Sequence, residues 1–261
     1  MTARTSVVTG SASGIGKATK QVLESRGEKV IGVDLHDADI TVDLAIANGR
    51  AALVDQVTEL SGGSIDAIHA IAGLALPVSA TVQVNFFGMV ATLEGLRPLL
   101  LSVSAPRAVG VTSMASLGPV DDQLVAAMTA GDEAAGVARA EVLAGKPETG
   151  GALIYASTKK AIAQWVRRNA PKAEWAGASI PLNAVAPGII RTPMTAKHTE
   201  SEGSRAALLE LVPMPLNGIA EPIVVARLLA WLGGEENTHL CGQVVFVDGG
   251  SDAVIRGDST W

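Results

Sequence analysis

Short apolar runs alternate along this 261-residue chain with longer segments of amphipathic, helical spacing. The apolar runs predict strands at Ser6–Val8, Val30–Val33, Ala67–Ile71, Ala108–Thr112, Leu182–Val185 and Val244–Val247. The amphipathic segments predict helices that include Ile15–Ser25, Gly49–Leu60, Val82–Leu101 and Pro222–Leu232. Because strands and helices that alternate in this rhythm form parallel sheets, we predict an α/β fold with helices on both faces of the sheet.

Length, charge and cysteine content narrow the class of protein. The length fits one domain over residues 1–261 better than two small ones. The net charge is −6 and no basic run occurs, which argues against nucleic acid as a partner. No stretch approaches the length of a membrane span. A lone cysteine, Cys241, and an N-terminus without a long apolar stretch favour a cytoplasmic protein. The four histidines lack metal-ligand spacing, so we expect no metal site.

The stretch "VVTGSASGIGKA" follows the first predicted strand and opens the first predicted helix. Its glycines, Gly10, Gly14 and Gly16, allow a tight turn and a close approach of the backbone to a ligand. The start of a helix offers unpaired N–H groups and a positive dipole end, which suit a pyrophosphate. An ordinary glycine-rich loop is the alternative, but the strand–turn–helix context favours a dinucleotide site.

Asp34 closes the second predicted strand, 24 residues after Gly10. A carboxylate there can accept hydrogen bonds from the adenosine ribose and would repel a 2′-phosphate. Ser13, inside the glycine loop, supplies no positive charge for such a phosphate. Asp34 and Ser13 together predict that the cofactor is NAD rather than NADP. The alternative is that Asp34 caps a helix or is simply exposed to solvent.

The stretch "YASTK", Tyr155–Lys159, contains the only tyrosine of the chain. Four residues are about one helical turn, so Tyr155 and Lys159 can share one face of a helix. A single tyrosine on a helix is usually structural, and this pair alone does not establish a catalytic role.

Further motifs, in order along nearly the whole chain, resemble those of the short-chain dehydrogenase/reductase family. "TGSASGIG" resembles the family's cofactor loop, and "VDL" at Val42–Leu44 resembles its adenine-contacting segment. "VNFFG" and "VTSMAS" resemble the segments that hold its catalytic asparagine and serine, and "YASTK" resembles its Tyr-x-x-x-Lys signature. "NAVAPGIIRTPM" resembles the Pro-Gly segment beside the nicotinamide.

The resemblance implies a single Rossmann-like, doubly wound parallel sheet of about seven strands. It implies that the catalytic residues are Asn85, Ser113, Tyr155 and Lys159. It implies that NAD is bound by Gly10, Ser13, Gly14, Ile15, Gly16, Asp34, Asp43, Leu44, Ala72, Gly73, Tyr155, Lys159, Pro187, Gly188, Ile190 and Thr192.

The implied chemistry is the oxidation of an alcohol or the reduction of a carbonyl. Tyr155 would be the general acid/base. Lys159, together with the charge of the nicotinamide, would lower the pKa of its phenol, which is about 10 in free tyrosine. Lys159 would also hold the nicotinamide ribose. Ser113 would hold the reacting oxygen, and Asn85 would anchor a water that links Lys159 to solvent.

The sequence departs from the family pattern in two places. "AIAG" stands where the family has Asn-Asn-Ala-Gly, so Ile71 replaces an asparagine that often braces the sheet. Ser113 and Tyr155 are 42 residues apart, and the additional length lies in the segment Leu117–Gly151, whose middle reads as helix. A long insert at this point resembles the bacterial 3α-hydroxysteroid dehydrogenase/carbonyl reductases.

The insert should affect assembly. Most of the family forms tetramers through two long helices, one of which carries the tyrosine, and an insert over that surface would leave a homodimer. Its apolar residues must be covered by neighbouring helices or by a second subunit; they are Leu124, Val125, Met128, Val137, Val142 and Leu143. A mobile substrate lid and a tetramer are the alternatives.

The predicted activity is an NAD-dependent alcohol dehydrogenase that also acts as a carbonyl reductase, with a non-catalytic nucleotide-binding scaffold as the alternative. The loop from Met194 to Pro215 and the segment "AGLALPV" are apolar, which favours a hydrophobic cyclic or aromatic alcohol or ketone. Pro171 follows the catalytic motif closely enough to break its helix near Asn169–Pro171.

Overall fold

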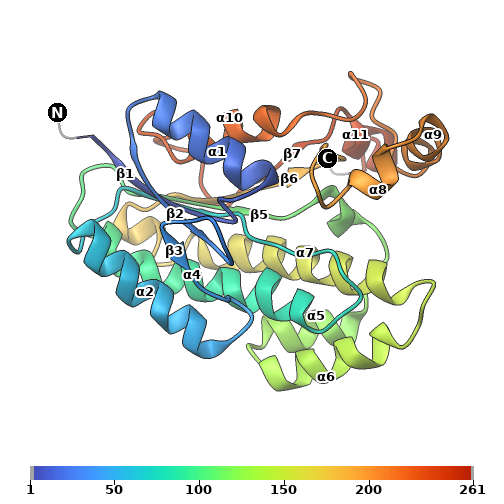
Figure 1. Cartoon of the computed structure of the whole chain (residues 1–261), viewed down its shortest axis with the longest axis horizontal. Coiled ribbons are helices and arrows are strands. Elements are labelled where there is room, and N and C mark those ends of the chain that lie inside the picture. Colours follow the sequence, from blue (N-terminus) through green and yellow to red (C-terminus); the bar gives the residue numbers. More distant parts are fainter. Residues whose placement is uncertain (1–2, 260–261) are drawn as a thin grey trace.

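The computed structural model describes residues 3–259 and contains one seven-stranded, all-parallel sheet (Figure 1). The strands lie in the order β3-β2-β1-β4-β5-β6-β7. Their bounds are β1 Thr5–Thr9, β2 Lys29–Asp34, β3 Ile40–Thr41, β4 Ala67–Ala70, β5 Arg107–Val111, β6 Leu182–Pro187 and β7 Val244–Val247. The predicted α/β class and doubly wound sheet are confirmed. Six of the seven strands were predicted. The remaining one, β3, is too short to give an apolar run, and the sequence did not locate it.

Helices cover both faces of the sheet (Figure 1). On one face lie α1 (Gly14–Ser25) and α10 (Pro222–Leu232), which pack against each other. On the other face lie α2 (Ala47–Ser61), α4 (Met89–Leu96) and α7 (Gly150–Asn169). Successive side chains of a strand point to opposite faces, so neighbouring valines enter different cores. Val7 belongs to the core under α2 and α4, and Val8 belongs to the core under α1 and α10.

The predicted helix Val82–Leu101 is wrong in detail, because the segment is composite. It consists of α3 (Ala80–Val82), a π-helical turn Gln83–Gly88, α4 and a 3₁₀ turn Arg97–Leu100. Pro98 lies in that last turn. Because proline has no backbone N–H, it cannot donate the hydrogen bond that would continue the α-helix. The π turn places the side chain of Asn85 in the interior of the protein.

The middle of the insert forms two helices, which corrects the prediction of one. They are α5 (Asp122–Thr129) and α6 (Glu133–Ala144), and they are separated at Gly131, which has a φ of 78°. The side chains of Leu124, Met128 and Leu143 are fully buried, and both helices pack against α7 of the same chain. Val142 is the exception, since 58% of it is exposed.

The catalytic-motif helix α7 ends at Asn169, two residues before Pro171. The predicted break is therefore confirmed, and the chain continues through turns to a short 3₁₀ segment, Ala176–Ala178. The remaining helices, α8 (Ala196–Thr199), α9 (Glu202–Leu211) and α11 (Ser251–Arg256), lie near one end of the molecule (Figure 1). Within residues 3–259, no helix is long and apolar enough to cross a membrane.

A buried histidine gives the fold a predicted sensitivity to acid. His69 lies in β4, and neither of its ring nitrogens has a hydrogen-bond partner among residues 3–259. Burial lowers its pKa from 6.5 to about 3. The unfolded chain binds this proton near pH 6.5 but the folded chain only near pH 3, so the free energy of unfolding should fall as the pH drops between these values.

Urea unfolding between about pH 5 and about pH 7 measures this effect. His69→Leu should flatten the pH dependence, because it removes the buried imidazole. Equal pH dependence in the wild type and in His69→Leu would contradict the prediction.

Candidate active site

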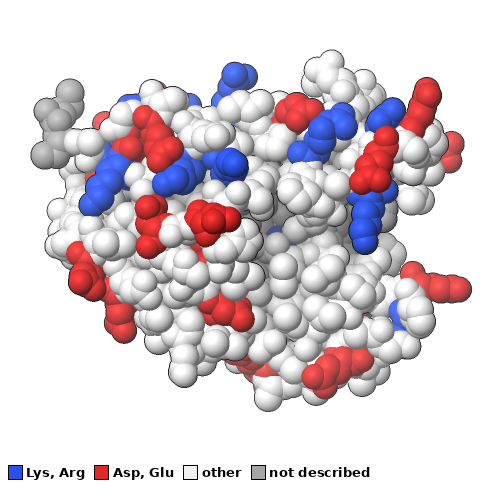
Figure 2. All heavy atoms as spheres, viewed as in Figure 1, with Lys and Arg blue, Asp and Glu red and all other residues white. Residues whose placement is uncertain are grey.

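Two adjoining pockets lie at the carboxyl ends of the strands, and Figure 2 shows the molecule hollowed near the middle of this face. Every residue that the sequence assigns to a cofactor lines at least one of them. The first pocket is lined by Gly10, Ser13, Gly14, Ile15, Gly16, Ala72, Gly73, Ser113, Tyr155, Lys159, Pro187, Gly188, Ile190 and Thr192, among others. The second adds Asp34, Asp43 and Leu44. Asn85 is the one predicted site residue that lines neither.

The glycine loop packs too tightly for side chains at two positions. Gly10 has a φ of 72°, and a Cβ added to Gly16 would lie 2.0 Å from the Gly10 carbonyl oxygen. Ser13 precedes α1, yet among the described residues no side chain caps that helix start. The first N–H groups of α1 are therefore free to bind an anion at the first pocket. The pyrophosphate of a dinucleotide is an anion of this kind.

Acidic side chains stand at the other end of the second pocket. Asp34 accepts hydrogen bonds from the N–H groups of Ala12 (2.9 Å, Oδ2) and Leu35 (2.7 Å, Oδ1). Asp43 accepts one from the N–H of Ala45 (2.8 Å). These bonds fix both carboxylates, and each keeps further acceptor positions that are suited to hydroxyl or amino groups of an adenosine.

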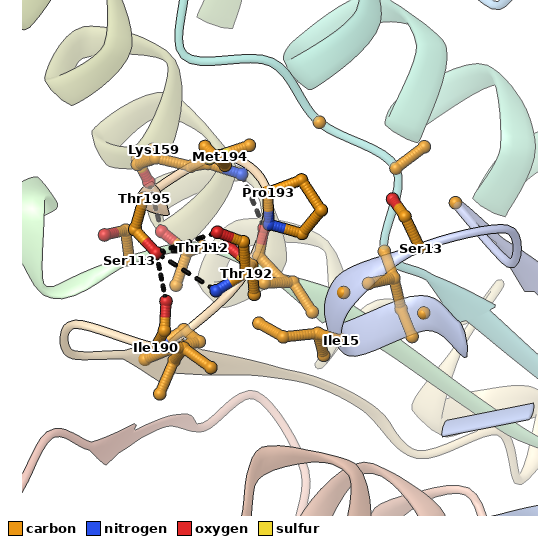
Figure 3. A pocket seen from close by; sticks show the side chains of 18 of the residues that line it. Ser13, Ile15, Thr112, Ser113, Lys159, Ile190, Thr192, Pro193, Met194 and Thr195 are labelled. Atoms are coloured by element: carbon orange, nitrogen blue, oxygen red, sulfur yellow. Dashed lines mark hydrogen bonds between the residues drawn. The ribbon is translucent and has the colours of Figure 1, made fainter. Parts of the chain in front are cut away.

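Ser113, Tyr155 and Lys159 meet in the first pocket (Figure 3 labels Ser113 and Lys159). Ser113 follows β5 and lines the same pocket as Tyr155, and its side-chain oxygen accepts a hydrogen bond from the Ala115 N–H (3.1 Å). Tyr155 and Lys159 lie one turn apart on α7, with the Lys159 ammonium 5.6 Å from the centre of the tyrosine ring. Lys159 donates a hydrogen bond to the Val111 carbonyl oxygen (3.0 Å), which connects α7 to β5.

In the protein without cofactor, burial shifts the pKa of both Tyr155 and Lys159. Desolvation raises the pKa of Tyr155, and the nearby Ser113 side chain opposes that shift. Desolvation lowers the pKa of Lys159 to about 8. The expected lowering of the tyrosine pKa depends on Lys159 together with the nicotinamide charge, and it stays a prediction for the protein with NAD bound.

The Asn85 side chain is occupied by structural hydrogen bonds. Its oxygen accepts from the Leu74 N–H (2.7 Å), and its amide donates to the Leu74 carbonyl oxygen (2.9 Å) and to the Thr158 hydroxyl (3.1 Å). A Cβ added to Gly73 would lie 3.2 Å from the Asn85 oxygen and 3.5 Å from the Lys159 nitrogen. Asn85 thus holds the loop after β4 against α7 beside Lys159, and its link to a water stays a prediction.

Several residues around the site escaped sequence reasoning. The Thr9 hydroxyl accepts hydrogen bonds from the N–H groups of Ile71 (2.9 Å) and Ala72 (3.1 Å). Thr9 therefore braces the sheet next to Ile71, the residue that replaces the asparagine of the family pattern. The Thr195 hydroxyl donates to the Ile190 carbonyl oxygen (2.5 Å) and accepts from the Thr192 N–H (3.1 Å), as Figure 3 shows. The spacing of the two threonines in "TPMT" was the only signal for this turn.

A family model described as Enoyl-(Acyl carrier protein) reductase matches residues 10–252. The 3-alpha-hydroxysteroid dehydrogenase/carbonyl reductase of Comamonas testosteroni is 34% identical over 96% of this chain and 97% of its own. The chain belongs to the short-chain dehydrogenase/reductase family. This family member is also 28% identical, over 96% of its length, to the cis-4-hydroxycyclohexanecarboxylate dehydrogenase of Sinomonas cyclohexanicum, of which it covers 97%.

Solved structures agree with this assignment. The 3-alpha-hydroxysteroid dehydrogenase from Pseudomonas sp. B-0831, solved in complex with NADH, superposes on this short-chain dehydrogenase/reductase with a TM-score of 0.87 and 38% identity. The match covers 97% of this chain and 99% of the other. Levodione reductase, at 23% identity and a TM-score of 0.74, shares the fold. The chain is therefore an oxidoreductase of this family.

Proposed function

We propose that this short-chain dehydrogenase/reductase uses NAD to interconvert a secondary alcohol and a ketone on a hydrophobic cyclic or aromatic substrate. The observation that carries the proposal is the meeting of Ser113, Tyr155 and Lys159 beside two pockets with a free helix start between them. The NADH complex and the names of the similar proteins support it. A non-catalytic scaffold would have little reason to keep all three side chains.

The chain's own residues would position the substrate and move one proton. Ser113 would hold the substrate oxygen, while the Tyr155 hydroxyl takes the alcohol proton during oxidation and returns it during reduction. The Lys159 ammonium would stabilise the phenolate. Thr192 and the Pro187–Gly188 segment line the part of the pocket suited to the nicotinamide. When bound, the nicotinamide ring accepts or supplies the hydride.

Asp34 is the reason to propose NAD rather than NADP. Its carboxylate lines the second pocket and is held by two backbone N–H groups, so it cannot easily turn away from a bound adenosine. A 2′-phosphate placed there would meet a fixed negative charge.

Apolar side chains near the first pocket favour a hydrophobic substrate. Met194 lines this pocket and is 47% exposed. Leu76 and Val78 line neither pocket but are exposed on the segment after β4, which the sequence assigns to the substrate side. Met214, which the sequence grouped with the substrate loop, is instead buried, and its sulfur accepts a hydrogen bond from the Ile189 N–H (3.3 Å). It therefore supports the floor of the site instead of facing the substrate.

Absorbance at 340 nm tests the proposal. Purified protein with NAD should reduce the cofactor when a steroid, terpenoid or aryl secondary alcohol is added, and should not do so with a phosphorylated alcohol of similar size. Binding of NADH without turnover on any member of such a panel would instead favour the scaffold.

We further propose that the protein is a homodimer. The helices α5 and α6 pack on α7, the helix through which most of the family would form a tetramer, and they lie away from α8 and α9 (Figure 1). This position supports a role in assembly over a role as a substrate lid. Light scattering should give about twice 26.6 kDa. Shortening residues 123–146 to a tight turn should raise the assembly state, and a wild-type tetramer would end the proposal.

A further inference from the structure

One arginine connects the insert to the wall of the second pocket. Arg50 lies in the first turn of α2 and is largely buried, with 11% of its side chain exposed. Its Nε donates to the Leu44 carbonyl oxygen and its Nη2 donates to the Ala45 carbonyl oxygen, both at 2.8 Å. The same guanidinium binds both carboxylate oxygens of Glu133, at 2.7 and 2.6 Å.

The two carbonyls belong to the part of the chain that forms the adenosine side of the pocket. Asp43, Leu44 and Ala45 all line it. Gly49 lies so close behind them that an added Cβ would be 1.9 Å from the Asp43 carbonyl oxygen. The wall thus lies between the start of α2 and the pocket, and the Arg50 guanidinium fixes the orientation of its Leu44 and Ala45 carbonyl groups.

Glu133 brings the insert into this arrangement, because it is the first residue of α6. A planar guanidinium can bind a carboxylate through two parallel bonds while its remaining N–H groups reach other acceptors. A lysine at position 50 could not hold two carbonyls and both carboxylate oxygens together. The other end of the insert is fixed independently, since the Asp121 N–H donates to the buried Ser157 hydroxyl on α7 (2.9 Å).

We propose that Arg50 is a positioning residue for the adenosine half of the cofactor, and that Glu133 holds Arg50 in place for this task. The insert then contributes to dinucleotide affinity through this ion pair. The inference rests on the proposed function only in taking the second pocket as the adenosine site.

The test compares binding of NADH, AMP and nicotinamide mononucleotide to the full-length protein. In Arg50→Lys and in Glu133→Gln, the Kd for NADH and the Kd for AMP should both rise by roughly 5- to 30-fold. This increase corresponds to the loss of one or two charge-assisted hydrogen bonds. The Kd for nicotinamide mononucleotide should not change. In turnover, the KM for NAD should rise far more than kcat falls at saturating cofactor.

Arg139→Gln is the matched control, because it breaks the Arg139–Asp121 ion pair of the same insert without touching the pocket wall. It should lower the melting temperature but leave the Kd for AMP unchanged. The exchange Arg50→Glu with Glu133→Arg adds a second control. It can restore the ion pair but not the two donors to the wall, so stability should recover while AMP affinity does not.

Three outcomes would overturn the inference. The first is that Arg50→Lys and Glu133→Gln bind AMP and NADH as tightly as the wild type does. The Arg50–Glu133 ion pair would then have a purely structural role. The second is an equal loss of affinity in Arg139→Gln, and the third is recovery of AMP affinity in the charge exchange. Failure of the wild-type protein to bind NADH would overturn the proposed function as well, and so is distinguishable from these three.

Discussion

Replacing Tyr155 with phenylalanine should remove nearly all turnover while leaving the fold and NADH binding in place. The ring still fills its position on α7, but the hydroxyl that exchanges the substrate proton is gone. Loss of general acid/base catalysis should lower kcat on the order of 10³-fold, whereas removal of one hydroxyl should change the stability by only about 1 kcal/mol. Steady-state kinetics, NADH titration and thermal unfolding measure the three quantities.

Two neighbouring lysines supply a matched comparison for the same dyad. Lys159→Met should lower kcat strongly because it removes the charge beside the phenol, whereas Lys160→Met, one residue further along α7, should have little effect. Comparable losses in the two variants would contradict the assigned roles.

The single tyrosine also allows its ionisation to be followed directly by ultraviolet difference titration, with Tyr155→Phe as the blank. In the protein alone the midpoint should lie above the ordinary value of 10, because desolvation raises the pKa. Addition of NAD should move the midpoint down to below 10, because a positive charge close to the phenol favours phenolate. A midpoint at or above 10 with NAD bound would contradict the role of Tyr155 as a base.

Asp34→Ala should reduce the preference for NAD over NADP by roughly 10- to 100-fold, corresponding to removal of a repulsion of one to a few kcal/mol. Most of the change should be an improved KM for NADP, with a smaller loss for NAD as the ribose loses its acceptor. The ratio of kcat/KM for the two cofactors, measured with one alcohol, gives the result.

Asp43→Asn is the control for this prediction, since Asp43 lines the same pocket but is assigned to the adenine. It should weaken NAD and NADP by similar factors. A wild-type protein that prefers NADP would show that the charge of Asp34 does not decide the choice of cofactor.

The parts of the fold that local sequence determines were predictable. The central strands are short and largely apolar because both faces of the sheet are covered, and α10 has the predicted bounds, Pro222–Leu232. The pair β2–β3 was not predictable, since β3 is two residues long and depends on a neighbour for its hydrogen bonds. The π turn at Gln83–Gly88 likewise depends on tertiary contacts, such as those of Asn85 with Leu74.

The candidate site divides in the same way. The glycine loop and the tyrosine–lysine pair could be recognised from short sequence spacings, and the structure places both in the first pocket. Thr9 and Arg50 could not be recognised from the sequence, because they bind backbone groups that only the folded chain brings near. Thr195 had only the spacing in "TPMT" as a signal. The raised pKa of Tyr155 in the protein without cofactor comes from burial, which the sequence does not show.

The anchoring of the insert on α7 has a consequence for how the protein opens. The side chains of Leu124, Met128 and Leu143 are buried, and the Asp121 N–H donates a hydrogen bond to the hydroxyl of Ser157, two residues after Tyr155. Segments that share buried contacts in this way exchange their amide hydrogens as one cooperative unit. The amides of α5 and of the first half of α7 should therefore be protected to a similar degree. A proteolytic cut at the Gly131 turn should therefore lower the protection of α5 and of the first half of α7 together.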